Sequence, residues 1–251
     1  RSGRHLADFP VDNRHRSPRS FCLRSRRLMT TASRDLEVSL AQRWGTVAGM
    51  DEVGRGALAG PVAVGVAVIG IDAPPVPEGL TDSKALTARR REALVEPVRS
   101  WTLASSVGYA SPQEIDQWGI IAALRLAGRR ALADVVSYGL VPGGVLLDGS
   151  HNWLSTPDDL FGLVDGPEDP FVRELPVQMQ VKADASCAVV AAASVLAKVE
   201  RDRLMQELED PGYGWASNKG YGSAAHTRAI AELGVSDQHR RSWKMPTQAT
   251  K

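Results

Sequence analysis

Apolar residues along the chain occur either in short continuous runs or at the spacing of one helix face. Short apolar runs predict buried strands over 46–50, 61–69, 101–109, 145–147 and 177–181. Apolar positions three and four residues apart predict helices over 87–99, 120–138, 185–209 and 224–233. Two strands close together, followed by strands separated by helices, favour an α/β fold with a mixed β-sheet and helices on both faces.

Residues that commonly cap helices stand at several of these ends. Ser111 is followed by a proline and, three positions on, by Glu114, which predicts a helix opening with a capping box. Gly139 and Gly234 follow the last apolar positions of two predicted helices. Residues 149–176 are rich in Pro, Gly and Asp, and they predict an exposed loop.

The N-terminal part differs from the rest of the chain. Eight arginines and two aspartates stand before Met29 without apolar periodicity, so residues 1–36 are expected to form a disordered tail. A basic nucleic-acid arm, a transit peptide and a true start at Met29 remain alternatives. The rest divides into a main domain over 37–204 and a C-terminal helical region over 205–251.

The composition is that of a globular protein without a strong overall charge. Of 251 residues, 43% are hydrophobic and 24% are charged, and the formal net charge is +1. This balance argues against a protein that binds nucleic acid through a broad basic stripe, but it allows a short footprint on a backbone. No apolar run approaches the roughly 18 residues of a membrane span. A reducing cytoplasm is the expected compartment.

The cysteines and histidines form no recognisable motif. Cys22 and Cys187 are too far apart to suggest a disulfide framework, and Cys187 lies in an apolar run typical of small buried residues. His226 and His239 lack partners at metal-ligand spacing and are expected to be structural or surface residues. The candidate chemistry therefore depends on acidic residues.

The strongest chemical signal is the segment Asp51-Glu52-Val-Gly54-Arg55-Gly56, which follows a predicted strand. Adjacent carboxylates repel each other unless a cation lies between them, and Mg²⁺ prefers such oxygen ligands. The glycines allow close approach to the backbone, whose N–H groups can bind a phosphate or a hydroxyl. A solvated acidic turn is the alternative. The glycine spacing argues against a dinucleotide-binding loop.

Two further acids stand in comparable places. Asp148 follows a short predicted strand, and Asp184 precedes the long predicted helix. Either could instead be a turn or helix-cap residue. Together with Asp51 and Glu52 they could line one pocket at the strand ends, where α/β sheets bind ligands. Such a set is what a two-metal phosphoryl-transfer site needs, with ions about 3.5–4 Å apart.

These motifs, in this order, resemble those of type 2 ribonuclease H, the family of bacterial ribonuclease HII. Asp-Glu-Val-Gly-Arg-Gly at 51–56 looks like its opening signature, and the resemblance spans about residues 46–243. Later blocks of the same likeness stand at 81–84, 147–149, 182–184, 197–202, 219–221 and 234–243. The resemblance implies a ribonuclease H-like mixed β-sheet flanked by helices, and a small helical C-terminal region that contributes to substrate binding.

By this resemblance the chain is an endoribonuclease that hydrolyses the RNA strand of RNA/DNA hybrids and cuts at single ribonucleotides embedded in duplex DNA. Its cofactor is implied to be Mg²⁺ or Mn²⁺, and its products to carry 3′-hydroxyl and 5′-phosphate ends. The residues implied to bind metal and to carry catalysis are Asp51, Glu52, Asp148 and Asp184. A monomer is expected, and a replication clamp remains open as a partner.

The resemblance also implies a set of substrate-binding residues. Gly54, Arg55 and Gly56 would contact the ribose 2′-hydroxyl at the junction, largely through backbone, and Tyr221 would stack on the deoxyribose beyond it. The 2′-hydroxyl both donates and accepts hydrogen bonds, and it distinguishes RNA from DNA.

Other basic or polar residues are candidates for phosphate contacts. Ser83 and Lys84 could hold a backbone phosphate, with a surface turn as the alternative. Lys198, Arg201 and Arg203 lie on one stretch of predicted helix, where we expect a solvated face and phosphate contact is the alternative.

Two other functions remain open at this point. A non-catalytic module that binds hybrids would keep the fold without the reaction. A glycosidase with paired carboxylates is the second alternative, although adjacent Asp51 and Glu52 are an unusual pair for that chemistry and few aromatic residues stand near them.

Overall fold

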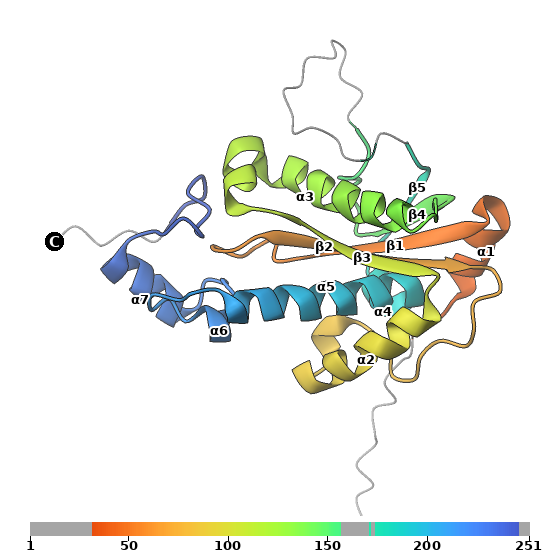
Figure 1. The fold of residues 1–251 in the computed structure, drawn as a ribbon, viewed down its shortest axis with the longest axis horizontal. Helices are drawn as coiled ribbons and strands as arrows, with labels where there is room; N and C mark the ends of the chain where they lie inside the picture. The colour runs from red at the N-terminus through yellow and green to blue at the C-terminus, as the bar shows by residue number, and fades with distance from the viewer. Residues whose placement is uncertain (1–31, 157–170, 172–173, 246–251) are drawn as a thin grey trace, which may run out of the picture.

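The centre of the protein is a mixed β-sheet (Figure 1). The computed structural model describes residues 32–156, 171 and 174–245. Within these ranges the strands are β1 (Thr46–Val53), β2 (Val62–Gly70), β3 (Ala104–Ala110), β4 (Gly144–Asp148) and β5 (Val177–Gln180). Their order is β3-β2-β1-β4-β5. The pairs β1–β2 and β2–β3 are antiparallel, and the pairs β1–β4 and β4–β5 are parallel, which confirms the predicted mixed sheet.

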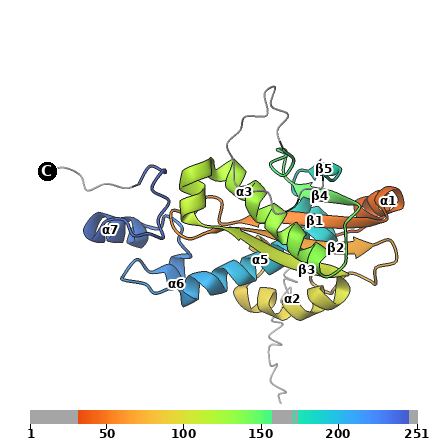
Figure 2. The same cartoon turned by 45° about the horizontal axis from the view of Figure 1, so that its top comes forward.

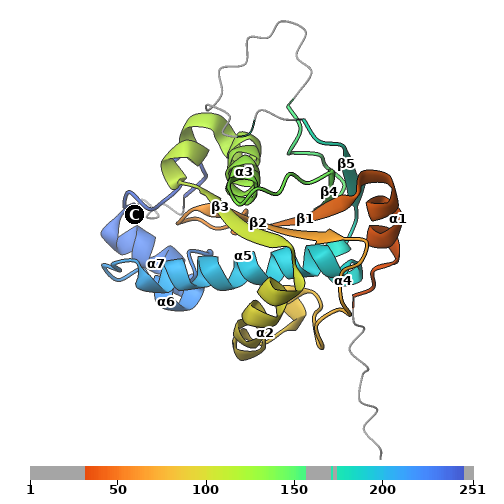
Figure 3. The same ribbon diagram turned by 45° about the vertical axis from the view of Figure 1, so that its right-hand side comes forward.

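Helices cover both faces of this sheet, as the sequence predicts. They are α1 (Asp35–Trp44), α2 (Ala88–Trp101), α3 (Pro112–Ser137), α4 (Ala183–Ser186), α5 (Ala188–Glu207), α6 (Trp215–Asn218) and α7 (Ala224–Leu233), with a 3-10 helix η1 (Ser83–Ala85). α3 lies on one face, and α2, α4 and α5 lie on the other (Figure 3). Each face packs a separate apolar core against its helices.

The position of α5 depends on small residues where it crosses the two central strands. A Cβ atom added at Gly49 of β1 would lie 2.5 Å from the carbonyl carbon of Val189, and one at Gly65 of β2 would overlap the carbonyl oxygen of Ala193. Only glycine at these positions lets the helix backbone lie directly on the strands. This close packing brings the middle of α5 next to the acidic end of β1.

The folded part begins earlier than the sequence predicts. Residues 32–36, assigned to a tail, belong to the folded body: Ala32 is buried, and Ser33 forms a bridge with Cys187. Glu37 is fully buried, and its carboxylate accepts a hydrogen bond of 3.0 Å from the backbone N–H of Val189 in the first turn of α5. An acid at a helix N-terminus satisfies a backbone donor there. The rest of the predicted tail, residues 1–31, lies outside the described residues.

Several element boundaries also differ from the predictions. β1 continues to Val53, so the acid pair lies inside the strand and not after it. Trp101 belongs to α2, with its indole N–H donating to the Pro74 carbonyl at 2.8 Å, and β3 starts only at Ala104. The capping box at Ser111 is confirmed. The long helix predicted from 185 is divided at Cys187 into α4 and α5.

The segment predicted as an exposed loop at 149–176 packs partly into the core. Trp153, Leu154 and Phe171 are buried against the α3 side of the sheet. Arg129 of α3 is buried beneath them; it donates to the Phe171 carbonyl at 2.6 Å and pairs with Glu174 at 2.6 Å. Residues 157–170 and 172–173 lie outside the described residues.

The C-terminal helical region forms a small apolar cluster with the end of α5 and the loop after β1. Its centre is the stacked pair Tyr213 and Trp215, with ring centroids 5.1 Å apart, and Ile230 of α7 packs against it. α6 and α7 lie at the end of the molecule opposite α1 (Figure 2). Within the described ranges, no helix is both long enough and apolar enough to cross a membrane.

Candidate active site

Two of the predicted catalytic acids lie on neighbouring parallel strands. Met50 of β1 pairs with Leu147 of β4, so the next residues, Asp51 and Asp148, stand side by side at the same edge of the site. Asp51 is only 3% exposed. The strand register therefore brings together two acids that are far apart in sequence.

The charges of these acids act on one another. The pKa of Asp51 is raised to about 7, mainly by burial and in smaller part by the charges of Glu52 and Asp148, whereas a hydrogen bond from Ser194 opposes the shift. The pKa of Asp148 is also raised, mainly by burial and then by the charge of Asp184. Asp51, Glu52, Asp148 and Asp184 thus form one electrostatically coupled group.

Asp184 joins the group through a short turn before α5. Lys182 has a left-handed backbone (φ 58°), and the following Ala183 N–H donates to an Asp148 carboxylate oxygen at 2.7 Å. Asp184 lies in the first turn of α4 and is buried. It does not cap α5, whose N-cap residue is Cys187. The structure thus favours a place in the acid group over the alternative of a cap for the long helix.

Lys84 reaches into this group, although its side chain is 71% exposed. Its ammonium nitrogen Nζ lies 3.0 Å from Oδ2 of Asp184. Partial burial alone would lower the pKa of Lys84, but the hydrogen bond and charge of Asp184, with the charge of Asp51, raise it above its usual value. Lys84 is therefore placed as a counter-charge to the acids.

Ser83 does not face the surface as the phosphate hypothesis requires. Its side chain is buried, and its Oγ lies 2.8 Å from Oγ of Ser194 on α5. The Ser194 hydroxyl also hydrogen-bonds Asp51. Ser194 was missed from sequence; the signal that could have found it is a single hydroxyl within the apolar run of α5. Ser83 and Ser194 thus form a buried hydrogen-bonded pair next to Asp51.

The donor types in this group suit a hard divalent cation. Carboxylate oxygens are the ligands that Mg²⁺ and Mn²⁺ prefer, and burial with like charges nearby destabilises the ionised acids unless a cation balances them. In the described part of the chain, however, no three His, Cys, Asp or Glu side chains are arranged to hold an ion as they stand. The residues fit the cation by chemistry, and their side chains must turn toward it to bind it.

The loop after β1 is held by two buried arginines. Arg240 donates to the carbonyl oxygens of Gly54 at 2.7 Å and Arg55 at 2.8 Å. Arg201 donates to the Pro61 carbonyl at 2.8 Å, and a Cβ added at Gly54 (φ 83°) would overlap its guanidinium group. Arg201 is fully buried, so the solvated face predicted for it is wrong.

The orientation of these carbonyls decides where the loop's N–H groups point. A planar trans peptide places its C=O and N–H on opposite sides. Since the Gly54 and Arg55 carbonyls point inward to Arg240, the N–H groups of Arg55 and Gly56 point outward. A Cβ atom added at Gly56 would meet no atom within 4 Å. The loop therefore offers two backbone donors on an open surface beside the acids.

Tyr221 is brought to the same loop by its neighbour in the chain. The Gly220 carbonyl accepts hydrogen bonds from the N–H groups of Leu58 at 2.8 Å and Ala59 at 3.1 Å. The Tyr221 ring is 37% exposed, and the Arg201 guanidinium carbon lies 5.5 Å from the ring centroid. The structure thus places Tyr221 beside the loop after β1.

Comparisons with known proteins identify the relatives of this chain. The family model described as Ribonuclease HII matches residues 48–246. A protein named Ribonuclease HII from Streptomyces avermitilis is 45% identical over 215 residues, which cover 85% of this chain and 82% of that protein. Another of that name from Paracoccus denitrificans is 46% identical over 202 residues, covering 78% and 84%.

Solved structures show the same fold. The ribonuclease H2 from Pyrococcus horikoshii OT3 has a TM-score of 0.57 at 26% identity, covering 80% of this chain and 95% of that one. A structure of Bst-RNase HIII in complex with Mn²⁺ has a TM-score of 0.54 at 20% identity, covering 82% and 70%. The second likeness concerns the fold alone.

Proposed function

The chain belongs to the ribonuclease HII family of nucleases, which cleave the RNA of RNA/DNA hybrids, and from this premise we propose that it also cuts duplex DNA at single embedded ribonucleotides. The products would carry 3′-hydroxyl and 5′-phosphate ends. The observation that carries the proposal is the convergence of Asp51, Asp148 and Asp184 beside an outward-facing backbone turn.

Asp51, Glu52, Asp148 and Asp184 would hold the divalent cations, Mg²⁺ or Mn²⁺. When bound, two such cations supply activation of the attacking water and stabilisation of the leaving oxygen. Ser194 keeps the Asp51 carboxylate oriented, and the Ala183 N–H does the same for Asp148. Lys84 balances the negative charge of Asp184 and remains a candidate for a phosphate contact.

Recognition of the ribonucleotide would depend on the turn after β1. The outward N–H groups of Arg55 and Gly56 can donate to a 2′-hydroxyl oxygen, a group that deoxyribose lacks. The two buried arginines hold the turn in this conformation before substrate arrives, which lowers the entropic cost of binding. The exposed face of Tyr221 would contact the adjacent sugar.

The experiment that tests this function is cleavage of a DNA duplex containing one ribonucleotide, and of an RNA/DNA hybrid, with products mapped at nucleotide resolution. With Mg²⁺ or Mn²⁺ present, we expect a single cut at the ribonucleotide. With a chelator, we expect no cut. Asp51→Asn should abolish the cut while circular dichroism remains unchanged, and Asp72→Asn at an exposed loop position should not affect it.

Two outcomes would contradict the proposal. Full activity of Asp51→Asn would remove the role of the acids. Tight hybrid binding by the wild-type protein with no product, even with Mn²⁺, would favour the non-catalytic binding module.

A further inference from the structure

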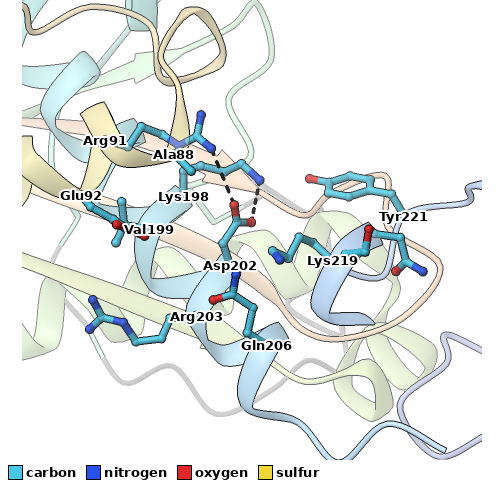
Figure 4. Close-up of a pocket in the computed structure, with 12 residues that line it drawn as sticks. Ala88, Arg91, Glu92, Lys198, Val199, Asp202, Arg203, Gln206, Lys219 and Tyr221 are labelled. Carbon is cyan, nitrogen blue, oxygen red and sulfur yellow. Dashed lines mark hydrogen bonds and ion pairs between the residues drawn. The ribbon is translucent and has the colours of Figure 1, made fainter. Parts of the chain in front are cut away.

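A cavity of about 410 Å³ lies between α2, α5 and the segment that leads from α6 to Tyr221 (Figure 4). Its charged lining residues are the four bases Arg91, Lys198, Arg203 and Lys219 and the two acids Glu92 and Asp202. Bases therefore outnumber acids in its wall, in a protein whose net charge is only +1. A local excess of positive charge inside a cavity attracts a small anionic group.

The positive charge is concentrated at the end next to Tyr221. Arg203 and Glu92 lie at the other end of the cavity (Figure 4). The ammonium group of Lys198 lies 5.9 Å from the Tyr221 ring centroid, and Lys219 stands two residues before Tyr221 in the chain. The Tyr221 end thus combines an aromatic wall with two lysines.

Asp202 organises this end without neutralising it. It accepts a 2.6 Å hydrogen bond from Lys198 on the same helix and pairs with Arg91 of α2 at 3.9 Å. One carboxylate is thereby shared by two cations from two elements. Among the described residues, no salt bridge joins Lys219 to a carboxylate, and its ammonium group donates a hydrogen bond to the Ala216 carbonyl.

Lys219 is also held in an unusual backbone conformation. Its φ is 53°, and it is one of two non-glycine residues with positive φ in the described ranges; the other, Lys182, borders the acid group. Arg201 donates to the Lys219 carbonyl at 3.0 Å and so maintains the strained conformation. Strain held in place by buried contacts is typical of functional positions.

We propose that this cavity binds a backbone phosphate of the cleaved strand, in the part that continues past the sugar at Tyr221. The inference rests on the proposed function and assigns to it a second contact point. Tyr221 itself lines the cavity, so a strand that lies against the Tyr221 ring borders it. The cavity volume is within the usual range of ligand sites. Lys198 and Lys219 bind the phosphate oxygens, while Asp202 keeps Lys198 in place.

The test uses the double variant Lys198→Gln/Lys219→Asn in the full-length protein, since asparagine tolerates a left-handed backbone. We expect KM for the single-ribonucleotide duplex to rise about tenfold with kcat unchanged, as the loss of charged hydrogen bonds predicts. The slope of log KM against log salt should fall by about one. The matched control is Arg43→Gln, at an exposed position of α1 at the far end of the molecule, which should behave as the wild type.

A second arm locates the phosphate. Each phosphate of the cleaved strand is replaced in turn by a neutral methylphosphonate. At one position near the junction, the wild type should lose affinity and the double variant should show no further loss. Identical responses of both proteins at every position, or a double variant with the KM and salt slope of Arg43→Gln, would overturn the proposal. A wild-type protein that cuts no substrate would instead reject the proposed function.

Discussion

His226 and His239 share a buried hydrogen bond, with their Nε2 atoms 3.2 Å apart. The Ser236 N–H donates to Nδ1 of His239 at 2.9 Å, so the proton of His239 is on Nε2 and points to His226. Nδ1 of His226 in turn lies 2.9 Å from the Tyr221 carbonyl, which can only accept. Both rings are thus neutral, and together they connect the C-terminal segment to Tyr221.

This pair predicts a pH dependence of stability. Burial, and then the proximity of His226, lower the pKa of His239 to about 4, below its usual 6.5. Between these values the unfolded chain takes up a proton that the folded chain does not, so stability is complete above pH 6.5 and is lost as the pH falls toward 4. The loss attributable to His239 between pH 7 and pH 4.5 should be on the order of 2 kcal/mol.

Urea unfolding of the wild type and His239→Gln across this range measures that contribution. The variant should be less stable at pH 7, and its stability should change less with pH. Parallel curves for the two proteins would show that His239 does not titrate as the buried pair requires.

The same substitution, glycine to alanine, should lower stability at Gly54 but leave it unchanged at Gly56. Gly54→Ala forces a Cβ into Arg201 at a positive φ, so it should destabilise the fold by about 2 kcal/mol or more. Gly56→Ala meets no protein atom, so its Tm should equal that of the wild type. If substrate approaches the backbone there, its KM should rise severalfold. Unchanged kinetics in Gly56→Ala would contradict close approach at that residue.

Divalent cations should stabilise the wild type through the acid group. A ligand that binds only the folded state increases the free energy of unfolding, by about 2.7 kcal/mol at a concentration of 100 times Kd, and therefore raises Tm. Asp51→Asn removes a buried carboxylate whose pKa is raised, so this variant should be more stable than the wild type in chelator. It should also gain less from Mn²⁺. An equal Mn²⁺ gain in thermal-shift measurements would place the cation elsewhere.

Ser194→Ala removes the hydroxyl between Ser83 and Asp51. The loss of these buried hydrogen bonds should cost about 1 kcal/mol of stability and lower kcat by roughly threefold to tenfold, because Asp51 is less well oriented. KM should change little. Ser137→Ala, at an exposed helix end, is the control. Equal kcat values in the two variants would mean that Ser194 has only a packing role.

Much of the fold could be predicted from local patterns, because the spacing of apolar residues that marks a strand or a helix is visible within a short segment of sequence. The mixed sheet and the capping box at Ser111 were predicted in this way. The acids were recognised for a related reason: each stands at or near the end of an apolar strand or before a helix, and a glycine turn follows Asp51 and Glu52. These features are contiguous in sequence, and they also carried the likeness to the ribonuclease HII family.

What only the tertiary structure decided are the contacts between distant segments. The burial of Arg201 and Arg240 beneath the turn, and the inward position of Ser83, depend on which helix faces pack against the sheet. The pairing of His226 with His239 depends on how the C-terminal segment returns to the core. A polar side chain looks the same in sequence whether it meets water or a carbonyl, because burial is set by the packing of the whole chain.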